Sequence, residues 1–308
     1  MAIFVQGKPI DVQSLVAATN LQQQSEVIPI LEEVADQPED ADLSLGHGGA
    51  GKTVVCHFFN EEFLLPWWLK HHKNVFDHGI MIDYASTDRS CELIREICPT
   101  WEIRPSRNKF FESVAIDREV MDIERKLLGW RMALNVTEFL YGNTDHLVDN
   151  SAYSQYLIAN YVFVDMGAES NPVELSYDRP LHQQRYWGYD EFANNGVYKG
   201  GQMGRMCRSV HNYPIVYAGG RHFGDDRPKS FSDLYIFYYG HASDSEQGIR
   251  RKTQIKDKVG DSEANSAHRH DAEYYKTGFT DLRNRSRDLA SEIEPILEHN
   301  RRITGEDW

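Results

Sequence analysis

Between residues 53 and 142 the period of the hydrophobic positions changes from one segment to the next. Continuous apolar runs such as TVVCHFF are typical of buried strands, whereas apolar residues at every third or fourth position are typical of amphipathic helices. The expected strands are 53–59, 78–84, 101–104 and 130–134, and the expected helices are 61–72, 91–98 and 113–128. This alternation predicts an α/β fold with a parallel sheet, covering helices, and ligands at the carboxyl ends of the strands.

The remaining segments have a different pattern. Residues 150–240 are richer in aromatic residues, glycine and polar turns, and the strands expected there are 156–164, 214–218 and 233–239. Further helices are expected at 12–18 and 28–34 near the N-terminus, at 246–258, and around 282–299. We divide the chain into an N-terminal extension with an acidic linker, two halves of one α/β domain, and a C-terminal helical extension, with the boundaries 1–45, 46–145, 146–260 and 261–308.

The charge balance restricts the possible partners. The 308 residues contain 33 Lys and Arg against 47 Asp and Glu, which gives a net charge of −14. Sequence-independent binding to nucleic acid or to an anionic membrane needs a basic face, so the overall charge argues against both partners. No apolar run is long enough to span a bilayer, and the first residues lack the features of a signal peptide. We therefore expect a cytoplasmic protein without a transmembrane segment.

The segment GHGGAGKT, residues 46–53, fits the phosphate-loop pattern G-x-x-x-x-G-K-[ST]. That loop works when a buried strand precedes it and a helix begins after it, because the backbone N–H groups then converge on phosphate. Here an acidic linker precedes the glycines and a strand-like run follows Lys52. A glycine-rich connector is therefore the alternative to a nucleotide site.

Asp83 lies at the end of the strand expected at 78–84 and is followed by Ser86 and Asp88. A carboxylate at the carboxyl end of a strand in an open α/β sheet points toward the binding crevice. Ser86 and Asp88 are also residue types that cap the start of a helix. Ligand binding and helix capping both remain open for this segment.

Asn135, Thr137 and Glu138 come directly after the strand expected at 130–134. Glu138 could bind a hard divalent cation through its carboxylate, with Asn135 and Thr137 as neutral oxygen neighbours. The alternative is a polar strand end that binds nothing.

Two histidines and several arginines occur near turns in the second half of the chain. His222 and His241 lie in Gly-flanked turns, where a neutral imidazole can bind a metal or form a hydrogen bond with phosphate. Arg205, Arg208 and Arg221 form a local basic cluster in an acidic protein. Such a cluster suits a diphosphate or an anionic sugar, and a solvated surface is the alternative.

Taken in order, three segments resemble the N-terminal half of the family 2-like glycosyltransferases with the GT-A fold. These segments are CHFFNEEFLLPWWLKHH, HGIMIDYASTDRS and GWRMALNVTEFL. The resemblance covers residues 53–142 and continues more weakly through VFVDMGAES, GGRHF and YYGHASDSEQGIRRK.

This resemblance implies the GT-A fold, a mixed and mostly parallel sheet with helices on both faces. Residues 46–145 would bind a nucleotide-sugar donor, and residues 146–260 would bind a glycan or glycoconjugate acceptor. The implied reaction is transfer of a sugar to an acceptor hydroxyl. The implied donor-binding positions are Phe58, Asn60, Glu61, Asp83, Ser86, Asp88, Arg205 and Arg208.

In the family an Asp-x-Asp segment holds Mg²⁺ or Mn²⁺ against the diphosphate. Asn135 and Thr137 stand at the positions of the two aspartates, so only Glu138 is acidic here. The implied metal ligands are Glu138, Asn135, His222 and His241. Three outcomes are open: these ligands suffice for a divalent cation, basic residues replace the cation, or catalysis is lost.

An inverting transfer also needs a carboxylate base near the acceptor hydroxyl. Glu169 follows an expected strand and a glycine turn, and Asp190 and Glu191 are further candidates for this base. The leading hypothesis is an inverting glycosyltransferase of polysaccharide or glycoconjugate synthesis. Two alternatives stay open: an inactive GT-A domain that serves as a binding module, and a phosphate-loop nucleotidase or kinase that uses Lys52.

Overall fold

The computed structural model describes most of the chain after residue 50. The described residues are 51–144, 147, 154–167, 174–190, 208–217, 219–221, 230–259, 268–305 and 308, together with the backbone of 3–5 and 8–10. The two N-terminal pieces are β1 (Ile3–Val5) and β2 (Lys8–Ile10), which pair antiparallel. The helices expected in the N-terminal extension lie outside the described residues.

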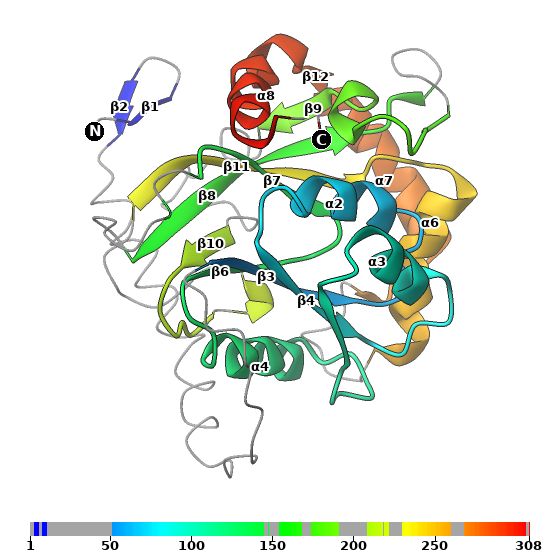
Figure 1. Cartoon of the computed structure of the whole chain (residues 1–308). Coiled ribbons are helices and arrows are strands. Elements are labelled where there is room, and N and C mark those ends of the chain that lie inside the picture. Colours follow the sequence, from blue (N-terminus) through cyan, green and yellow to red (C-terminus); the bar gives the residue numbers. More distant parts are fainter. Residues whose placement is uncertain are drawn as a thin grey trace.

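One mixed sheet organises the described part of the chain (Figure 1). Its strands are β3 (Lys52–Phe58), β4 (His78–Asp83), β5 (Glu102–Pro105), β6 (Trp130–Leu134), β7 (Glu138–Gly142), β8 (Gln155–Val164), β9 (Trp187–Asp190), β10 (Arg208–His211), β11 (Ser230–His241) and β12 (Arg287–Asp288). Their order is β12-β9-β8-β10-β6-β3-β4-β5, with β11 on β8 and β7 on β11.

The two halves of this sheet differ in strand direction. In the first half β3 pairs in parallel with β4 and β6, and β4 pairs in parallel with β5. In the second half β10 runs antiparallel to β6 and β8, and β9 runs antiparallel to β8 and β12. The strand β11 is parallel to β8 and antiparallel to β7. The predicted α/β fold with a mixed sheet is confirmed.

Helices cover both faces of the parallel half, as predicted. On one face Cys56 packs in a cluster with Trp68 of α2 (Leu65–His72), and α3 (Ser90–Ile97) contributes Ile94 to the same cluster. On the other face Val55 packs in a second cluster with Met121 of α4 (Ser113–Glu124). Because strands in such a sheet are buried on both faces, β3 appears in the sequence as a continuous apolar run rather than an alternating one.

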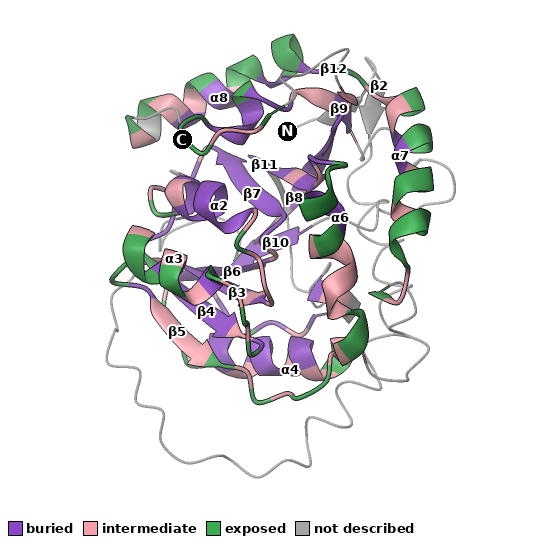
Figure 2. Cartoon of the chain, turned by 90° about the vertical axis from the view of Figure 1, so that its right-hand side faces the viewer, coloured by how far each residue is buried: buried purple, intermediate pink, exposed green. Residues whose placement is uncertain are grey.

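The C-terminal residues form further covering layers. They are α6 (Glu246–Thr253), the 3₁₀ helix η4 (Gln254–Lys258), α7 (Ala272–Arg285) and α8 (Ala290–Thr304). The helix α7 contacts β8 and β9, and α8 contacts β7. Figure 2 shows buried residues in the central strands and in α2, and exposed outer faces on α7 and α8. None of the described helices is long and apolar enough to cross a membrane.

Three sequence-based expectations differ from the structure in the second half. The single helix expected around 282–299 is two helices, because β12 interrupts it to pair with β9. Residues 214–217 of the strand expected at 214–218 form no strand, and β10 lies at 208–211 instead. The short strand β7 was not expected. After the turn at Asn135 the chain re-enters the sheet by pairing with β11, which is almost 100 residues away in sequence.

Candidate functional site

A pocket of about 440 Å³ lies at the carboxyl ends of β3 and β6. Its walls come from the end of β3, the start of α4, the turn between β6 and β7, the 3₁₀ turn η3 (Gly219–Arg221), the end of β11, and α6 with His268 and Tyr275. The sheet changes here from parallel to antiparallel, because β6 has β3 on one side and β10 on the other. Open α/β sheets bind ligands at this kind of position.

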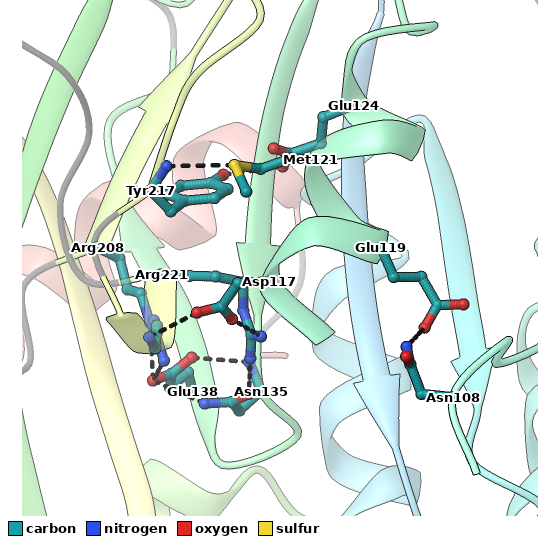
Figure 3. Close-up of polar contacts among 11 residues, drawn as sticks. Asn108, Asp117, Glu119, Met121, Glu124, Asn135, Glu138, Arg208, Tyr217 and Arg221 are labelled. Atoms are coloured by element: carbon teal, nitrogen blue, oxygen red, sulfur yellow. Dashed lines mark hydrogen bonds and ion pairs between the residues drawn. The ribbon is translucent and has the colours of Figure 1, made fainter. Parts of the chain in front are cut away.

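Glu138 forms a buried ion pair with Arg208 in the floor of this pocket (Figure 3). Arg208 donates to Glu138 Oε1 from Nη2 at 2.6 Å and from Nε at 3.0 Å. The N–H of Asn135 donates to the other oxygen, Oε2, at 2.7 Å. The side chains of Arg208 and Glu138 are 2% and 0% exposed, so this charge pair is sealed from solvent. Both carboxylate oxygens of Glu138 therefore already have partners inside the protein.

A second buried ion pair lies next to the first and joins α4 to η3 (Figure 3). Arg221 donates to Asp117 Oδ1 at 2.6 Å from Nη1 and to Asn135 Oδ1 at 2.9 Å from Nη2. The N–H of Gly220 donates to Asp117 Oδ2 at 2.7 Å. Burial raises the pKa of Asp117, and the neighbouring Arg221 opposes that shift. The side-chain oxygen of Asn135 is thus an acceptor for an arginine.

Sequence analysis did not identify Asp117. A signal for it was present, because Asp117 lies on the same face of α4 as the buried residues Val120 and Met121. A carboxylate at a core position of an amphipathic helix needs a cationic or hydrogen-bonding partner. The partner could not be identified from the sequence, since Arg221 follows 104 residues later.

The third carboxylate of the pocket is also paired. Arg251 Nη1 donates to Glu61 Oε1 at 3.0 Å. Burial is the main cause that raises the pKa of Glu61, and Arg251 opposes it. The adjacent Lys252 also lines the pocket, and its ammonium lies 5.2 Å from the centre of the Tyr275 ring. Lys252 forms no ion pair or hydrogen bond with any residue that the structure describes.

Three histidines line the pocket, and the pKa of each is lowered. Burial lowers the pKa of His57 to about 3, and Arg221 adds to this shift. Burial, followed by the nearby Lys252 and Arg251, lowers the pKa of His241 well below its usual value. The pKa of His268 is lowered mainly by burial. The Nε2 atom of His57 is buried and has no hydrogen-bond partner among the described residues.

Three predicted donor-binding residues, Phe58, Glu61 and Arg208, line the pocket, and so do the predicted metal ligands Asn135, Glu138 and His241. The structure therefore brings together positions that are far apart in the sequence. Asp190 lies elsewhere, at the end of β9, where it faces Tyr161 of β8 in the sheet register. Glu169, Glu191, Arg205 and His222 lie outside the described residues.

The other predicted donor-binding residues join two turns to each other. Asp83 Oδ1 accepts from the N–H of Ser86 at 2.9 Å, and Ser86 Oγ accepts from the N–H of Asn60 at 3.0 Å. Asn60 Oδ1 accepts from the N–H of Thr87 at 2.7 Å, and Asp88 Oδ2 accepts from the N–H of Glu62 at 3.0 Å. Asp83 and Ser86 therefore stabilise these turns and do not cap α3. Asp88 contacts the start of that helix, because its Oδ1 accepts from the N–H of Ser90 at 2.9 Å. Asn60 and Asp88 also line a neighbouring pocket of about 780 Å³.

The helix η4 covers the carboxyl ends of β3 and β4. Gln254 Nε2 donates to the carbonyl of Asn60 at 2.5 Å, and Lys258 Nζ donates to the carbonyl of Tyr84 at 2.7 Å. The Lys258 ammonium also lies 3.9 Å from the centre of the Phe59 ring. The accessible part of the crevice is therefore on the β6 side of β3, away from Asp83.

The phosphate-loop interpretation of Lys52 does not agree with the structure. Lys52 begins the strand β3, and its N–H donates to Asp77 Oδ2 at 2.7 Å. A phosphate loop needs a helix N-terminus directly after the lysine, and a strand lacks the converging N–H groups. Lys52 also does not line either pocket.

A divalent cation does not fit the motif residues as they are arranged here. Within the described residues there is no group of three His, Cys, Asp or Glu side chains that could hold a metal ion. Glu138 is neutralised by Arg208, and Asn135 Oδ1 accepts from Arg221. A cation at this point would meet two guanidinium groups, whose charge repels it.

No protein-family model and no curated protein matches this chain. Among solved structures, the mannosyltransferase PcManGT from Pyrobaculum calidifontis, in complex with GDP-Man and Mn²⁺, is 13% identical, covers 47% of this chain and 46% of its own, and has a TM-score of 0.27. S. aureus TarS 1–349 is 12% identical over 76% of this chain and 73% of its own, with a TM-score of 0.35. Its complex with UDP-GlcNAc is 11% identical over 76% and 74%, with a TM-score of 0.33.

The chain spans about half the length of the mannosyltransferase. The function is therefore derived from the geometry of the site itself.

Proposed function

We propose that this protein transfers a sugar from a nucleotide-sugar donor to an acceptor hydroxyl. The observation that carries the proposal is the pocket at the carboxyl ends of β3 and β6, where the described lining residues include one more cation than carboxylates. A nucleotide sugar has an anionic diphosphate, and its leaving group becomes more negative as the sugar departs. Fixed positive charge stabilises that developing charge.

The remaining lining residues suit the uncharged parts of such a donor. Phe59 and Phe111 provide aromatic surface, and the Nε2 atom of His57 has no hydrogen-bond partner among the described residues. Most small-molecule sites combine an apolar wall with a few placed polar groups, which fix the orientation of the ligand. A base or sugar ring of the donor could stack on the aromatic side chains, and a donor hydroxyl could form a hydrogen bond with His57.

The acceptor in this proposal is a glycan or glycoconjugate, and the transfer is inverting. The neighbouring pocket of about 780 Å³ shares Arg251 with the donor pocket, so it offers the acceptor a place beside the donor. The three carboxylates of the donor pocket are all paired with arginines, so none of them suits the role of general base. We retain Glu169 as the proposed base, with Asp190 and Glu191 as alternatives.

A binding module without catalytic activity is the second candidate. It is favoured by Asn135 and Thr137, which stand at the Asp-x-Asp positions, and by the pairing of Glu138 with Arg208. A binding module would recognise the donor without breaking its glycosidic bond to phosphate.

The experiment is a turnover assay with UDP-, GDP- and dTDP-sugars, in which release of the nucleoside diphosphate is followed over time. A CMP-sugar, which contains a single phosphate, serves as the control donor. We expect release from one class of diphosphate donor, at first as slow hydrolysis in the absence of the acceptor. Tight binding without release would instead support the binding module. If none of the donors binds, the proposed function is wrong.

A further inference from the structure

The described charged residues of the donor pocket form ion pairs with one another, except for one lysine. Among the described residues three carboxylates line it, and each is paired with an arginine: Glu138 with Arg208, Asp117 with Arg221, and Glu61 with Arg251. The fourth described cation is Lys252, which has no carboxylate partner within the described part of the chain. The described wall residues therefore include one more cation than carboxylates, in a protein whose total charge is −14.

Lys252 is also partly withdrawn from water. Burial and the adjacent Arg251 lower its pKa well below the usual value for lysine, while Glu61 opposes this shift. An ammonium group that is withdrawn from water without a counter-charge is unfavourable, and such groups are often found at functional sites. An anion that enters the pocket would supply the missing counter-charge.

Lys252 has neighbours that would meet the same anion. Arg251 precedes it on α6, and among the described residues its Nη2 has one long contact of 3.5 Å, with the carbonyl of Gly240. His241 lies near both cations, since both contribute to lowering its pKa. The neutral imidazole of His241 can donate one hydrogen bond to a phosphate oxygen.

We propose that the pocket binds the diphosphate of its donor without a divalent cation, and that Lys252 and Arg251 of α6 take the place of the metal. The motif residues support this arrangement. Glu138 and Asn135, which would be expected to hold the metal, accept from Arg208 and Arg221 instead. A divalent cation between phosphate and carboxylate is replaced here by cationic side chains that contact the phosphate directly.

This inference rests on the proposed function, because the ligand class is that of a nucleotide-sugar donor. The test is isothermal titration of UDP, GDP and inorganic pyrophosphate, each in EDTA and in Mn²⁺. The proteins are wild type, Lys252→Met and the matched control Lys256→Met. Lys256 is exposed on η4 and lines neither pocket, so its substitution removes the same charge from another place.

We expect one nucleoside diphosphate to bind equally well in EDTA and in Mn²⁺. Loss of the Lys252 contact should weaken that binding about tenfold or more, as for a charge-assisted hydrogen bond, and Lys256→Met should leave it unchanged. Lys252→Met should remain folded, because it removes an unpaired charge and leaves no partner behind. Circular dichroism and thermal melting of both variants check this point.

The results that contradict the inference differ from those that contradict the proposed function. If UDP or GDP binds only with Mn²⁺, or binds Lys252→Met as tightly as wild type, the inference is wrong and the proposed function stands. If pyrophosphate binds in EDTA through Lys252 but no nucleotide binds, the anion site is supported and the proposed function is wrong. If none of the three probes binds in either buffer, both are wrong.

Discussion

Charge pairing at individual residues explains why this site departs from the pattern it resembles. Asn135 accepts from Arg221 with its side chain and donates to Glu138 with its backbone N–H. An aspartate at this position would place a second carboxylate beside Glu138, and the two like charges would repel each other at low dielectric. The neutral amide of Asn135 therefore fits this turn, because the negative charge of Glu138 is already neutralised by Arg208.

The ion pair between Glu138 and Arg208 leads to a prediction at this scale. Arg208→Met should destabilise the protein by about 3–5 kcal/mol, because it leaves Glu138 buried without its cation. Urea unfolding measures the effect. Arg89→Met is the matched control, because it removes an arginine whose partner Glu92 is exposed, and it should change stability by about 0.5 kcal/mol or less. Equal losses in the two variants would contradict the buried pairing.

At the scale of elements, the C-terminal helices are part of the hydrophobic core. In α8 the side chains of Ile293 and Leu297 are 1% and 5% exposed and belong to the same cluster as the residues of α2. The helix α7 lies on β8 and β9, and Tyr275 from this helix reaches the donor pocket. Residues 268–304 therefore support the sheet and contribute to the site.

The packing of α8 can be tested with two substitutions on one helix. Ile293→Ala should cost about 2–5 kcal/mol, since it removes buried methyl groups and leaves a cavity. Glu298→Ala, on the exposed face of the same helix, should change stability by about 0.5 kcal/mol or less. Both are measured by chemical denaturation. If Ile293→Ala were as mild as Glu298→Ala, α8 would not be packed on the sheet in solution.

At the scale of the whole molecule, one hydrophobic cluster connects the two halves of the sheet. It includes Cys56 and Trp68 from the parallel half, and Phe163, Ile236 and Leu297 from the antiparallel half and its cover. The pocket at the carboxyl ends of β3 and β6 lies where these halves meet, with walls from both. Its geometry therefore depends on both halves being folded together.

This shared core predicts that the two halves unfold in one cooperative transition. Far-UV circular dichroism and tryptophan fluorescence should give the same midpoint in urea, and the calorimetric and van't Hoff enthalpies should agree. The tryptophans report on each half, since Trp68 lies on α2 and Trp187 on β9. Two separated transitions, or different midpoints for the two probes, would show that the halves are independent domains.

The first half of the sheet could be predicted from the sequence because its signals are local. The runs at 78–84 and 130–134 are mostly apolar, and the helices between them have apolar residues at every third or fourth position. The strands β7 and β9 were missed since they are short and owe their pairing to segments far away in the chain. The prediction of a single helix around 282–299 was wrong for the same reason. The strand β12, which interrupts it, pairs with the distant strand β9.

The sequence by itself determined which residues form the parallel strands and their helices, and which polar residues lie at the strand ends. The periodicity that carries this information spans only a few neighbouring positions. The tertiary structure decided what those polar residues do: Asp83 caps a turn, and Glu138 is matched by Arg208 from 70 residues away. Lys252 remains without a carboxylate within the described chain. Partners in an ion pair can be distant in sequence, so only the fold determines which charges are neutralised and which remain for a ligand.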